Sequence, residues 1–325
     1  MGRYILRRVL TAIPTLILIS MVIFGILALA PGDPLSDLAL NPSVPPEVRQ
    51  SIRESLGLED PIPVRYANWL TSTVKAVTGI DERALYSFRT RGPVIDLIKQ
   101  RLPTTLYISG SAFLLSIMIA IPVGVLSAVR QYSVFDNVAT TLSFIGFSLP
   151  TFCTGLLMIL LFTIRLDWLP SIYRSTIETE GLAGVWERTR QAIMPITVLG
   201  LFQAATLMRF VRASMLENIH QDYVRTARAK GLNERAVIMR HSLRNALIPV
   251  VTIIALSLPG VITGAVVTEQ IFRIPGMGQL LISSIQNNDT PVVMTITFLF
   301  SVLVVIFNLV ADIIYGVLDP RIKYS

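Results

Sequence analysis

The side chains best suited to chemistry lie in one basic stretch of an otherwise apolar chain. This stretch runs from Asp222 to Val250 and reads DYVRTARAKGLNERAVIMRHSLRNALIPV. Arginine and lysine pair with carboxylates, phosphates and other anionic groups. The stretch therefore predicts binding to an acidic surface, and the elements around it must hold it in place.

Catalytic chemistry is not indicated by the remaining reactive residues. The histidines His220 and His241 both fall in or beside the basic stretch, and the chain has no His-Glu-x-x-His pattern. It also lacks the Gly-x-x-x-x-Gly-Lys-Ser/Thr loop that cradles nucleotide phosphates. The single cysteine, Cys153, is expected to be an apolar filler. We therefore expect no catalytic residue, no metal site and no ATP site in this chain.

The composition points to a lipid bilayer. Hydrophobic residues make up 52% of the chain and charged residues only 15%, against about 25% charged in soluble proteins. A spanning helix needs roughly 20 apolar residues, and six uncharged stretches approach or exceed that length. They are Val9–Ala30, Leu102–Val129, Asn137–Ile164, Gln191–Met208, Asn245–Thr268 and Thr290–Ala311. Since backbone groups in lipid must be satisfied internally, an all-α membrane protein with six transmembrane helices is predicted.

The charge distribution orients these spans. Val9–Ala30 resembles a signal peptide, but its apolar run is too long, so we interpret it as a retained first span. With the N-terminus inside, the inner segments carry an excess of Arg and Lys, whereas the outer segments are nearly balanced. The positive-inside rule then places both termini and the basic stretch in the cytoplasm. This topology explains the positive net charge without a nucleic-acid partner.

The chain divides into three parts by these patterns. Residues 1–30 form the N-terminal segment and first span, and residues 31–101 form an extracytoplasmic insertion. Within the insertion, VPPEVRQSIRESLGL and DPIPVRYANWLTSTVKAVTG are each predicted to be helical. Residues 102–325 form the core with the other five spans, including a cytoplasmic loop over residues 215–246.

Local patterns predict two short helices in this loop. Glu217–Lys230 has Ile219, Tyr223 and Ala227 on one face, which is typical of an amphipathic helix. Gly231 follows in the place of a left-handed helix end. Asn233 is then suited to cap a second helix that leads into the fifth span.

Two partners fit such a surface. Anionic lipid headgroups would attract its positive charge. A protein groove would better explain a glycine-centred pair of helices with the small residues Ala227, Ala229 and Gly231 on one face. We favour docking to a protein.

The stretch resembles the cytoplasmic loop of the membrane subunits of bacterial ABC importers. The general signature there is Glu-Ala-Ala, a glycine, and Ile-x-Leu-Pro; this chain has Arg225-Thr226-Ala227, Gly231 and His241-x-Leu243-Arg244. These departures are like those of the dipeptide/oligopeptide permeases. Further motifs of that subfamily occur in order: RYILRRVLTAIPTL, LAPGDP, LGLEDPIPVRYANWL, RLPTTL, SLPTF, PGMG, DTPVV and DPR. The whole chain is similar to the first of the two permease subunits.

This resemblance implies a type I ABC importer permease fold in a bacterial inner membrane. It implies a second homologous permease subunit, two ATPase subunits that bind ATP and Mg²⁺, and an extracytoplasmic solute-binding protein. It also implies that the chain forms half of a pathway for di- or oligopeptides. Closely similar permeases carry nickel complexes, glutathione or oligosaccharides, which are the alternative cargoes.

Residue roles follow from the same resemblance. Two residues, Tyr223 and His241, are expected to pack between the loop helices, and the basic residues to meet acidic groups on an ATPase or lipid phosphates. The expected coupling residues are Asp222, Tyr223, Arg225, Thr226, Ala227, Arg228, Lys230, Gly231, Leu232, Glu234 and Arg235. Loop-packing roles are expected for His241, Leu243 and Arg244.

Polar residues within the spans leave alternatives open. Ser148, Pro150 and Thr151 either mark a helix kink or line the pathway with hydroxyl and carbonyl groups. Asp312 either forms a structural ion pair with a basic residue near the inner face or has a functional role within the membrane. A secondary transporter is a remote alternative, because such proteins place several ionisable groups in their spans.

Overall fold

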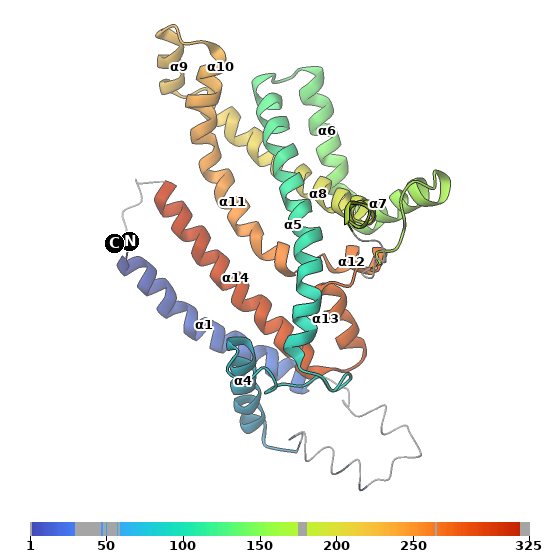
Figure 1. Ribbon diagram of the computed structural model, residues 1–325. Helices are drawn as coiled ribbons and strands as arrows, with labels where there is room; N and C mark the ends of the chain where they lie inside the picture. Colours follow the sequence, from blue (N-terminus) through green and yellow to red (C-terminus); the bar gives the residue numbers. More distant parts are fainter. Residues whose placement is uncertain are drawn as a thin grey trace. The chain divides into compact units, whose positions relative to one another are not determined.

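The computed structural model describes residues 2–29, 59–174, 181–263 and 265–318, together with positions 47, 50 and 57. These residues form helices joined by short connections (Figure 1). The predicted helix VPPEVRQSIRESLGL lies outside the described residues, apart from isolated positions. The predicted helix DPIPVRYANWLTSTVKAVTG is confirmed as α4 (Ile62–Thr78), which ends at Gly79 with a left-handed φ of 76°.

Within the described part of the chain, five helical runs are long and apolar enough to cross a membrane. They are α1 (Gly2–Leu29), α5 (Val94–Val129), α8 (Gly181–Ile219), α14 (Thr290–Leu318) and the continuous run Glu234–Thr263. A sixth span is obtained if α6 (Val134–Ser148) is taken together with the helix over Thr151–Arg165. The all-α expectation with six spans is therefore confirmed, with the third span in two pieces.

The break in the third span is at Leu149 and Pro150. The first piece, α6, ends where Leu149 adopts an extended backbone, as expected for a residue before proline. Pro150 then caps α7 (Thr151–Met158), which continues as the π-helical η1 (Ile159–Arg165). The two pieces are bent by 101°. The uncharged stretch Asn137–Ile164 is therefore not one straight helix.

The chain forms two compact units, residues 1–103 with 279–306 and residues 104–278 with 307–325. In the first unit, Phe24 of α1, Trp69 of α4 and Met294 of α14 form a buried cluster. The Phe24 ring meets Tyr66 edge-on at 5.5 Å, and the Tyr66 hydroxyl lies 2.8 Å from Ser20 Oγ. Aromatic packing and this hydrogen bond hold α4 against α1.

A buried carboxylate organises the other end of the first unit. Asp289 is 3% exposed and directly precedes α14. It accepts hydrogen bonds from the Ser87 hydroxyl and from the Phe88 backbone N–H, the latter at 2.9 Å. Asp289 thus fixes the segment before α5 to the start of α14.

Helix α8 is the centre of the second unit. It packs against α6, α7 and α11 (Leu243–Thr263), and it approaches α5 closely. A Cβ atom added at Gly124 of α5 would lie 2.8 Å from Val211 Cβ, and one added at Gly200 of α8 would lie 3.1 Å from the Ala112 carbonyl oxygen. The two glycines therefore let the α5 and α8 backbones come together, as small residues commonly do between membrane helices.

An ion pair joins α6 to α8 in the same unit. Asp136 is 2% exposed, and the Arg212 guanidinium donates to both of its carboxylate oxygens, at 2.7 and 2.8 Å. The carboxylate also accepts from the Ser127 hydroxyl and, at 2.9 Å, from the Tyr132 N–H. With a fifth hydrogen bond from the Thr140 hydroxyl at 3.3 Å, these donors satisfy a carboxylate that would otherwise be costly to bury.

Filling the α5–α8 contact should destabilise the second unit. We expect Gly124→Val to cost about 1–3 kcal/mol, because overpacking forces neighbours to shift. Thermal unfolding of the purified chain in nanodiscs measures the loss. Gly25→Val is the matched control, since Gly25 of α1 is also helical but has nothing within 4 Å of an added Cβ. Equal losses in the two variants would contradict the proposed close contact.

Breaking the buried ion pair should have a larger effect. We expect Asp136→Asn to cost about 3–5 kcal/mol, because Arg212 loses its charged partner. Asp222→Asn is the control, since Asp222 and Arg225 form an exposed pair at 3.5 Å and such pairs contribute about 0–1 kcal/mol. Chemical unfolding of both variants gives the comparison, and a minor change in Asp136→Asn would refute the assigned role.

Candidate functional site

The basic stretch folds as a helical elbow, which we define as residues 222–236. Its first arm is α9 (Asp222–Ala229), capped by Lys230. Gly231 has a φ of 74°; its N–H donates to the Arg228 carbonyl at 2.9 Å, and the Leu232 N–H donates to the Ala227 carbonyl at 3.4 Å. This pair of bonds is the Schellman ending that favours glycine. The predicted turn at Gly231 is confirmed.

The second arm leads directly into the fifth span. The Asn233 side chain accepts from the Arg235 N–H at 2.9 Å and so caps α10 (Glu234–Ala236), as predicted. The helix widens into the π-helical η2 (Val237–Ser242) and continues as α11. Figure 1 shows this elbow at the joined ends of α8 and α11.

The inner face of the elbow differs from the predicted one. Val224 and Ala227 of the elbow form a buried cluster with Val237 of the following helical segment. The first arm begins at Asp222 instead of Glu217, because α8 continues to Ile219. Ile219 therefore belongs to α8, whereas Tyr223 and Ala227 belong to α9. The prediction that these three residues share one face of a single helix is wrong.

Tyr223 does not pack between the two arms. It is 38% exposed, and its hydroxyl donates to Asn218 Oδ1 at 2.7 Å, which ties the elbow to the end of α8. Ala227 is buried within the elbow, so it is not available to a partner together with Ala229 and Gly231. The expected small-residue docking face is wrong in that respect.

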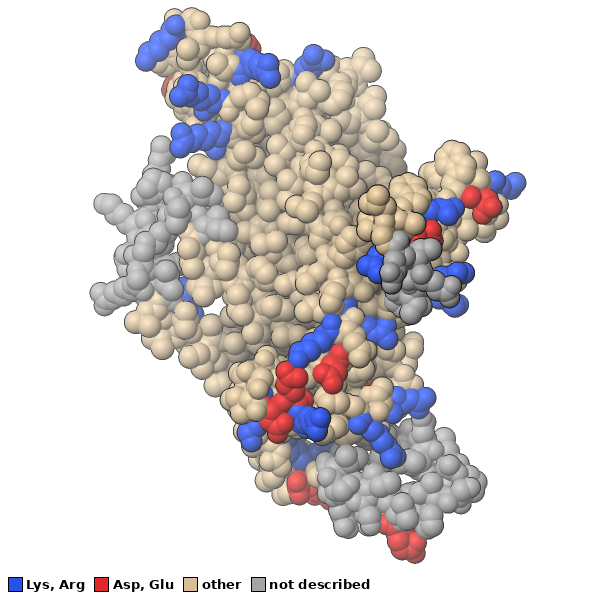
Figure 2. All heavy atoms as spheres, in the orientation of Figure 1, with Lys and Arg blue, Asp and Glu red and all other residues tan. Residues whose placement is uncertain are grey.

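The outer face of the elbow is basic. Arg225, Lys230 and Arg235 are exposed there, and Figure 2 shows positive side chains gathered at this end. Arg228 pairs with Glu234 across the turn at 2.7 Å, and this hydrogen bond raises the pKa of Arg228 above its ordinary value. The pair braces the two arms while the other cations face outward.

The remaining predicted loop residues are divided between the surface and the interior. Asp222, Thr226 and Leu232 are exposed, and the Thr226 hydroxyl donates to the Asp222 carbonyl at 2.9 Å. His241 and Leu243 are half-buried in η2 and α11, whereas Arg244 is exposed. The elbow therefore brings the predicted coupling residues together, but only some of them face outward.

A second candidate site is a cavity of about 460 Å³ in the unit built around α8. Its walls come from α5, α7, α8, α11 and α12 (Val266–Phe272). Of the three predicted pathway residues, only Thr151 lines it; Ser148 and Pro150 are exposed at the break in the third span.

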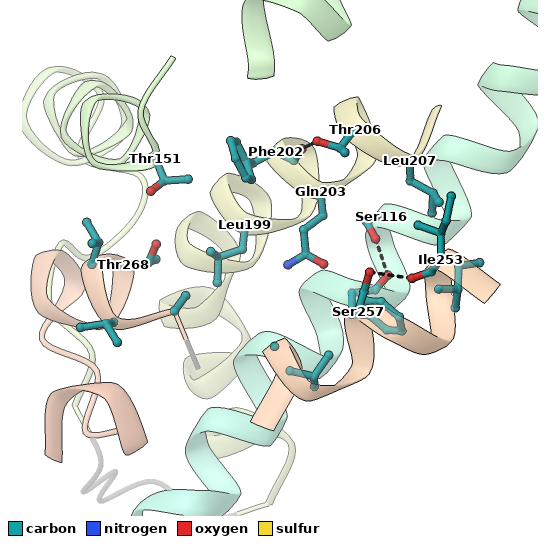
Figure 3. Close-up of a pocket in the computed structure, with 17 residues that line it drawn as sticks. Ser116, Thr151, Leu199, Phe202, Gln203, Thr206, Leu207, Ile253, Ser257 and Thr268 are labelled. Carbon is teal, nitrogen blue, oxygen red and sulfur yellow. Dashed lines mark hydrogen bonds between the residues drawn. The ribbon is translucent and has the colours of Figure 1, made fainter. Parts of the chain in front are cut away.

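The cavity wall is apolar with a few neutral polar groups. These groups are Ser116, Thr151, Gln203, Thr206, Ser257 and Thr268 (Figure 3). Sequence reasoning missed Gln203, because an uncharged amide did not interrupt the stretch Gln191–Met208. Its signal was a strongly polar group in an apolar span. No ionisable side chain is among the described residues of this wall.

Asp312 is half-buried in α14. Its two predicted roles, a structural ion pair and a functional group within the membrane, stay predictions. Another acidic residue, Asp136, pairs with Arg212 at 2.7 Å.

Family models cover nearly the whole chain. "Binding-protein-dependent transport system inner membrane component" matches residues 120–324. "Binding-prot-dependent transport system membrane comp, N-term" matches residues 1–109. These matches, with the apolar helices, identify a multi-pass membrane protein of a transport system.

Named relatives support the same assignment to a transport system. The chain is 43% identical to the oligopeptide transport system permease protein AppB of Bacillus subtilis, over all of both chains. It is 34% identical to the glutathione transport system permease protein GsiC of Escherichia coli K12, again over all of both chains.

The fold is also similar to that of a crystallised amino acid ABC transporter. The TM-score is 0.53 at 11% identity, covering 70% of this chain and 95% of that one. The architecture is thus the type I ABC importer permease fold. The chain belongs to the family of inner-membrane permease components of binding-protein-dependent ABC transport systems.

Proposed function

We propose that the chain is a permease subunit of an ATP-driven importer and forms half of the pathway for di- or oligopeptides. Its relatives include a permease named for oligopeptide transport and one named for glutathione transport. Glutathione is itself a small peptide, so it is the favoured alternative cargo. Nickel complexes and oligosaccharides are less favoured.

The helical elbow is the observation that carries this proposal. Its arms are braced internally by Val224, Ala227 and Val237 and by the Arg228–Glu234 pair, so it is a preformed shape. Its exposed Arg225, Lys230 and Arg235 suit an acidic protein groove. An ATPase subunit that holds this elbow would transmit its motion to α8 and α11.

The proposed assembly contains a second homologous permease subunit, two ATPase subunits and an extracytoplasmic solute-binding protein. ATP and Mg²⁺ would be bound by the ATPases, since this chain has no phosphate-binding loop and no proposed catalytic role. Both termini and the elbow would lie in the cytoplasm of a bacterial cell, in accord with the positive-inside rule.

The resemblance to ABC importers implies the transport cycle that we propose for this assembly. Closure of the ATPase pair on ATP would bring the two elbows together and turn the pathway outward. Substrate would then enter from the binding protein and leave to the cytoplasm after hydrolysis. The chain itself would supply the walls of the pathway and the mechanical connection, but no chemical step.

Strain at the elbow turn should uncouple transport. We expect Gly231→Val to weaken ATPase docking about tenfold, because an L-residue in the left-handed region costs about 1–2 kcal/mol. Gly231→Asn should stay close to wild type, because asparagine tolerates this conformation. Co-purification of the ATPases through a tag on this chain, and peptide uptake by the reconstituted complex, measure the effect.

Gly79→Val is the matched control for this experiment. Gly79 ends α4 with a φ of 76° and, like Gly231, has nothing within 4 Å of an added Cβ. It should leave ATPase binding unchanged. If Gly79→Val and Gly231→Val lose co-purifying ATPase to the same extent, the elbow is not the docking surface. If the wild type retains no ATPase, the importer proposal fails and secondary transport becomes the leading hypothesis.

A further inference from the structure

The α8 cavity contains a buried hydroxyl whose hydrogen-bonding capacity is unused. Thr268 is 1% exposed on α12, and its Oγ has no hydrogen-bond partner among the described residues. It is also one of the cavity-lining residues. A buried polar group without a partner costs free energy, so a ligand that satisfies it gains affinity.

Gln203 provides a second unused group in the same cavity. Figure 3 shows its side chain projecting from α8 into the space enclosed by the other wall residues. No residue that the structure describes receives or donates a hydrogen bond at this amide. A carboxamide offers two N–H donors and a carbonyl acceptor.

Three other hydroxyls of the wall, those of Ser116, Ser257 and Thr206 but not that of Thr151, bond to their own helices. Ser116 donates to the Phe113 carbonyl at 2.7 Å, Ser257 to Ile253 at 2.8 Å, and Thr206 to Phe202 at 3.5 Å. Their donor capacity is therefore used within the wall. Gln203 and Thr268 are distinguished from these three by unused donors and acceptors.

The chemistry of these two residues selects a class of ligand. A peptide group presents one N–H donor and one carbonyl acceptor, which a carboxamide and a hydroxyl can pair with together. The apolar remainder of the wall, including Phe113, Leu199 and Ile253, suits side chains of varied type. Since the described wall has no ionisable residue, it offers no selection by the charge of those side chains.

We propose that this cavity is a substrate subsite in which Gln203 and Thr268 bind backbone peptide groups of the transported peptide. The subsite reads the backbone and tolerates differences between side chains. This inference rests on the proposed function, because it takes a peptide as the cargo. The volume of about 460 Å³ falls within the range of small-molecule sites.

The test uses the purified complex of both permeases and both ATPases, without the binding protein. The probe is a tripeptide with a photoreactive benzoylphenylalanine between two alanines, whose crosslinks to this chain are mapped by mass spectrometry. Gln203→Met and Thr268→Val remove the polar groups at nearly constant volume. Each substitution should weaken binding of the tripeptide about tenfold. In the wild-type complex, the crosslinks should map to cavity residues.

Thr206→Val is the matched control, because its hydroxyl lines the same cavity but already bonds within α8. It should change affinity by less than about twofold, as expected for a group that contributes little. The thermal stability of each complex is compared with wild type, so that a loss of binding is separated from a loss of folding.

A chemical change in the probe provides the decisive readout. Methylating the peptide nitrogens removes the donors and should weaken binding to wild type about tenfold. The same methylation should have little effect in Gln203→Met, because interacting groups give non-additive losses. If the alanines of the probe are replaced by lysine or glutamate, the ratio of the peptide affinities of wild type and Gln203→Met should stay unchanged.

Three results would contradict the proposed subsite. The first is an equal loss of peptide affinity in Thr206→Val and Gln203→Met, and the second is a loss of affinity on methylation that adds fully to that of Gln203→Met. The third is crosslinking of the wild-type chain at residues outside the cavity. In each case the proposed function still stands if the wild-type complex imports peptide with its binding protein. If that complex hydrolyses ATP without importing peptide, the proposed cargo has failed instead.

Discussion

The close approach of α5 and α8 is the constraint on which the larger unit depends. Gly124 and Gly200 place one backbone against the other, and an added methyl group at either position would meet the neighbouring helix. In a bilayer, helices gain little by leaving lipid for each other, so such close packing must supply the association. Once α8 is fixed in this way, the side chains along it acquire defined positions.

Different positions along α8 contact different neighbours. Gln203 faces the cavity, Arg212 binds Asp136 of α6, and the Ser214 hydroxyl donates to the Ala246 carbonyl of α11 at 2.7 Å. The helix then ends at Ile219, next to the elbow. A single helix therefore connects the proposed substrate subsite with the proposed ATPase contact. A rigid helix is a physical element through which two sites can influence one another.

The same helix also carries an arginine against aromatic rings. The Arg209 guanidinium lies 4.5 Å from the centre of the Phe147 ring and 5.5 Å from that of Phe144. Phe147 in turn stacks on Phe202, a cavity residue, with the ring centres 6.3 Å apart. Cation–π contacts of this kind help to hold a positive charge near apolar surroundings. The stacking of Phe147 on Phe202 also connects α6 to the cavity wall.

Features set by neighbouring residues could be predicted from the sequence. The left-handed turn at Gly231 and the cap at Asn233 depend on a few adjacent positions, and the spans depend on long uncharged runs. The inner face of the elbow could not be predicted in the same way. That prediction needs the position at which α8 ends. Because α8 continues to Ile219, the first arm of the elbow starts later than predicted, and Val224 is buried in place of Tyr223.

Tertiary contacts account for the other differences. The ion pair between Arg212 of α8 and Asp136 of α6 joins segments far apart in the sequence, so it could not be predicted from local patterns. A kink was one of the two roles predicted for Pro150, whereas the size of the bend, 101°, depends on how α7 packs against α8 and α12. The polarity of Gln203 within an apolar span was visible in the sequence, but the cavity that it faces is formed by five helices and could not be predicted.

The π-helical η2 has a consequence for the tolerance of the chain to insertions and deletions. Its hydrogen bonds close at i→i+5, so this segment between the elbow and α11 holds more residues than an α-helix of the same length. Removing one residue from Val237–Ser242 can be absorbed by conversion to an ordinary α-helix, leaving both ends in register. The same deletion within α11 would rotate all that follows by about 100°. Length variation among homologous loops is therefore expected to concentrate in η2.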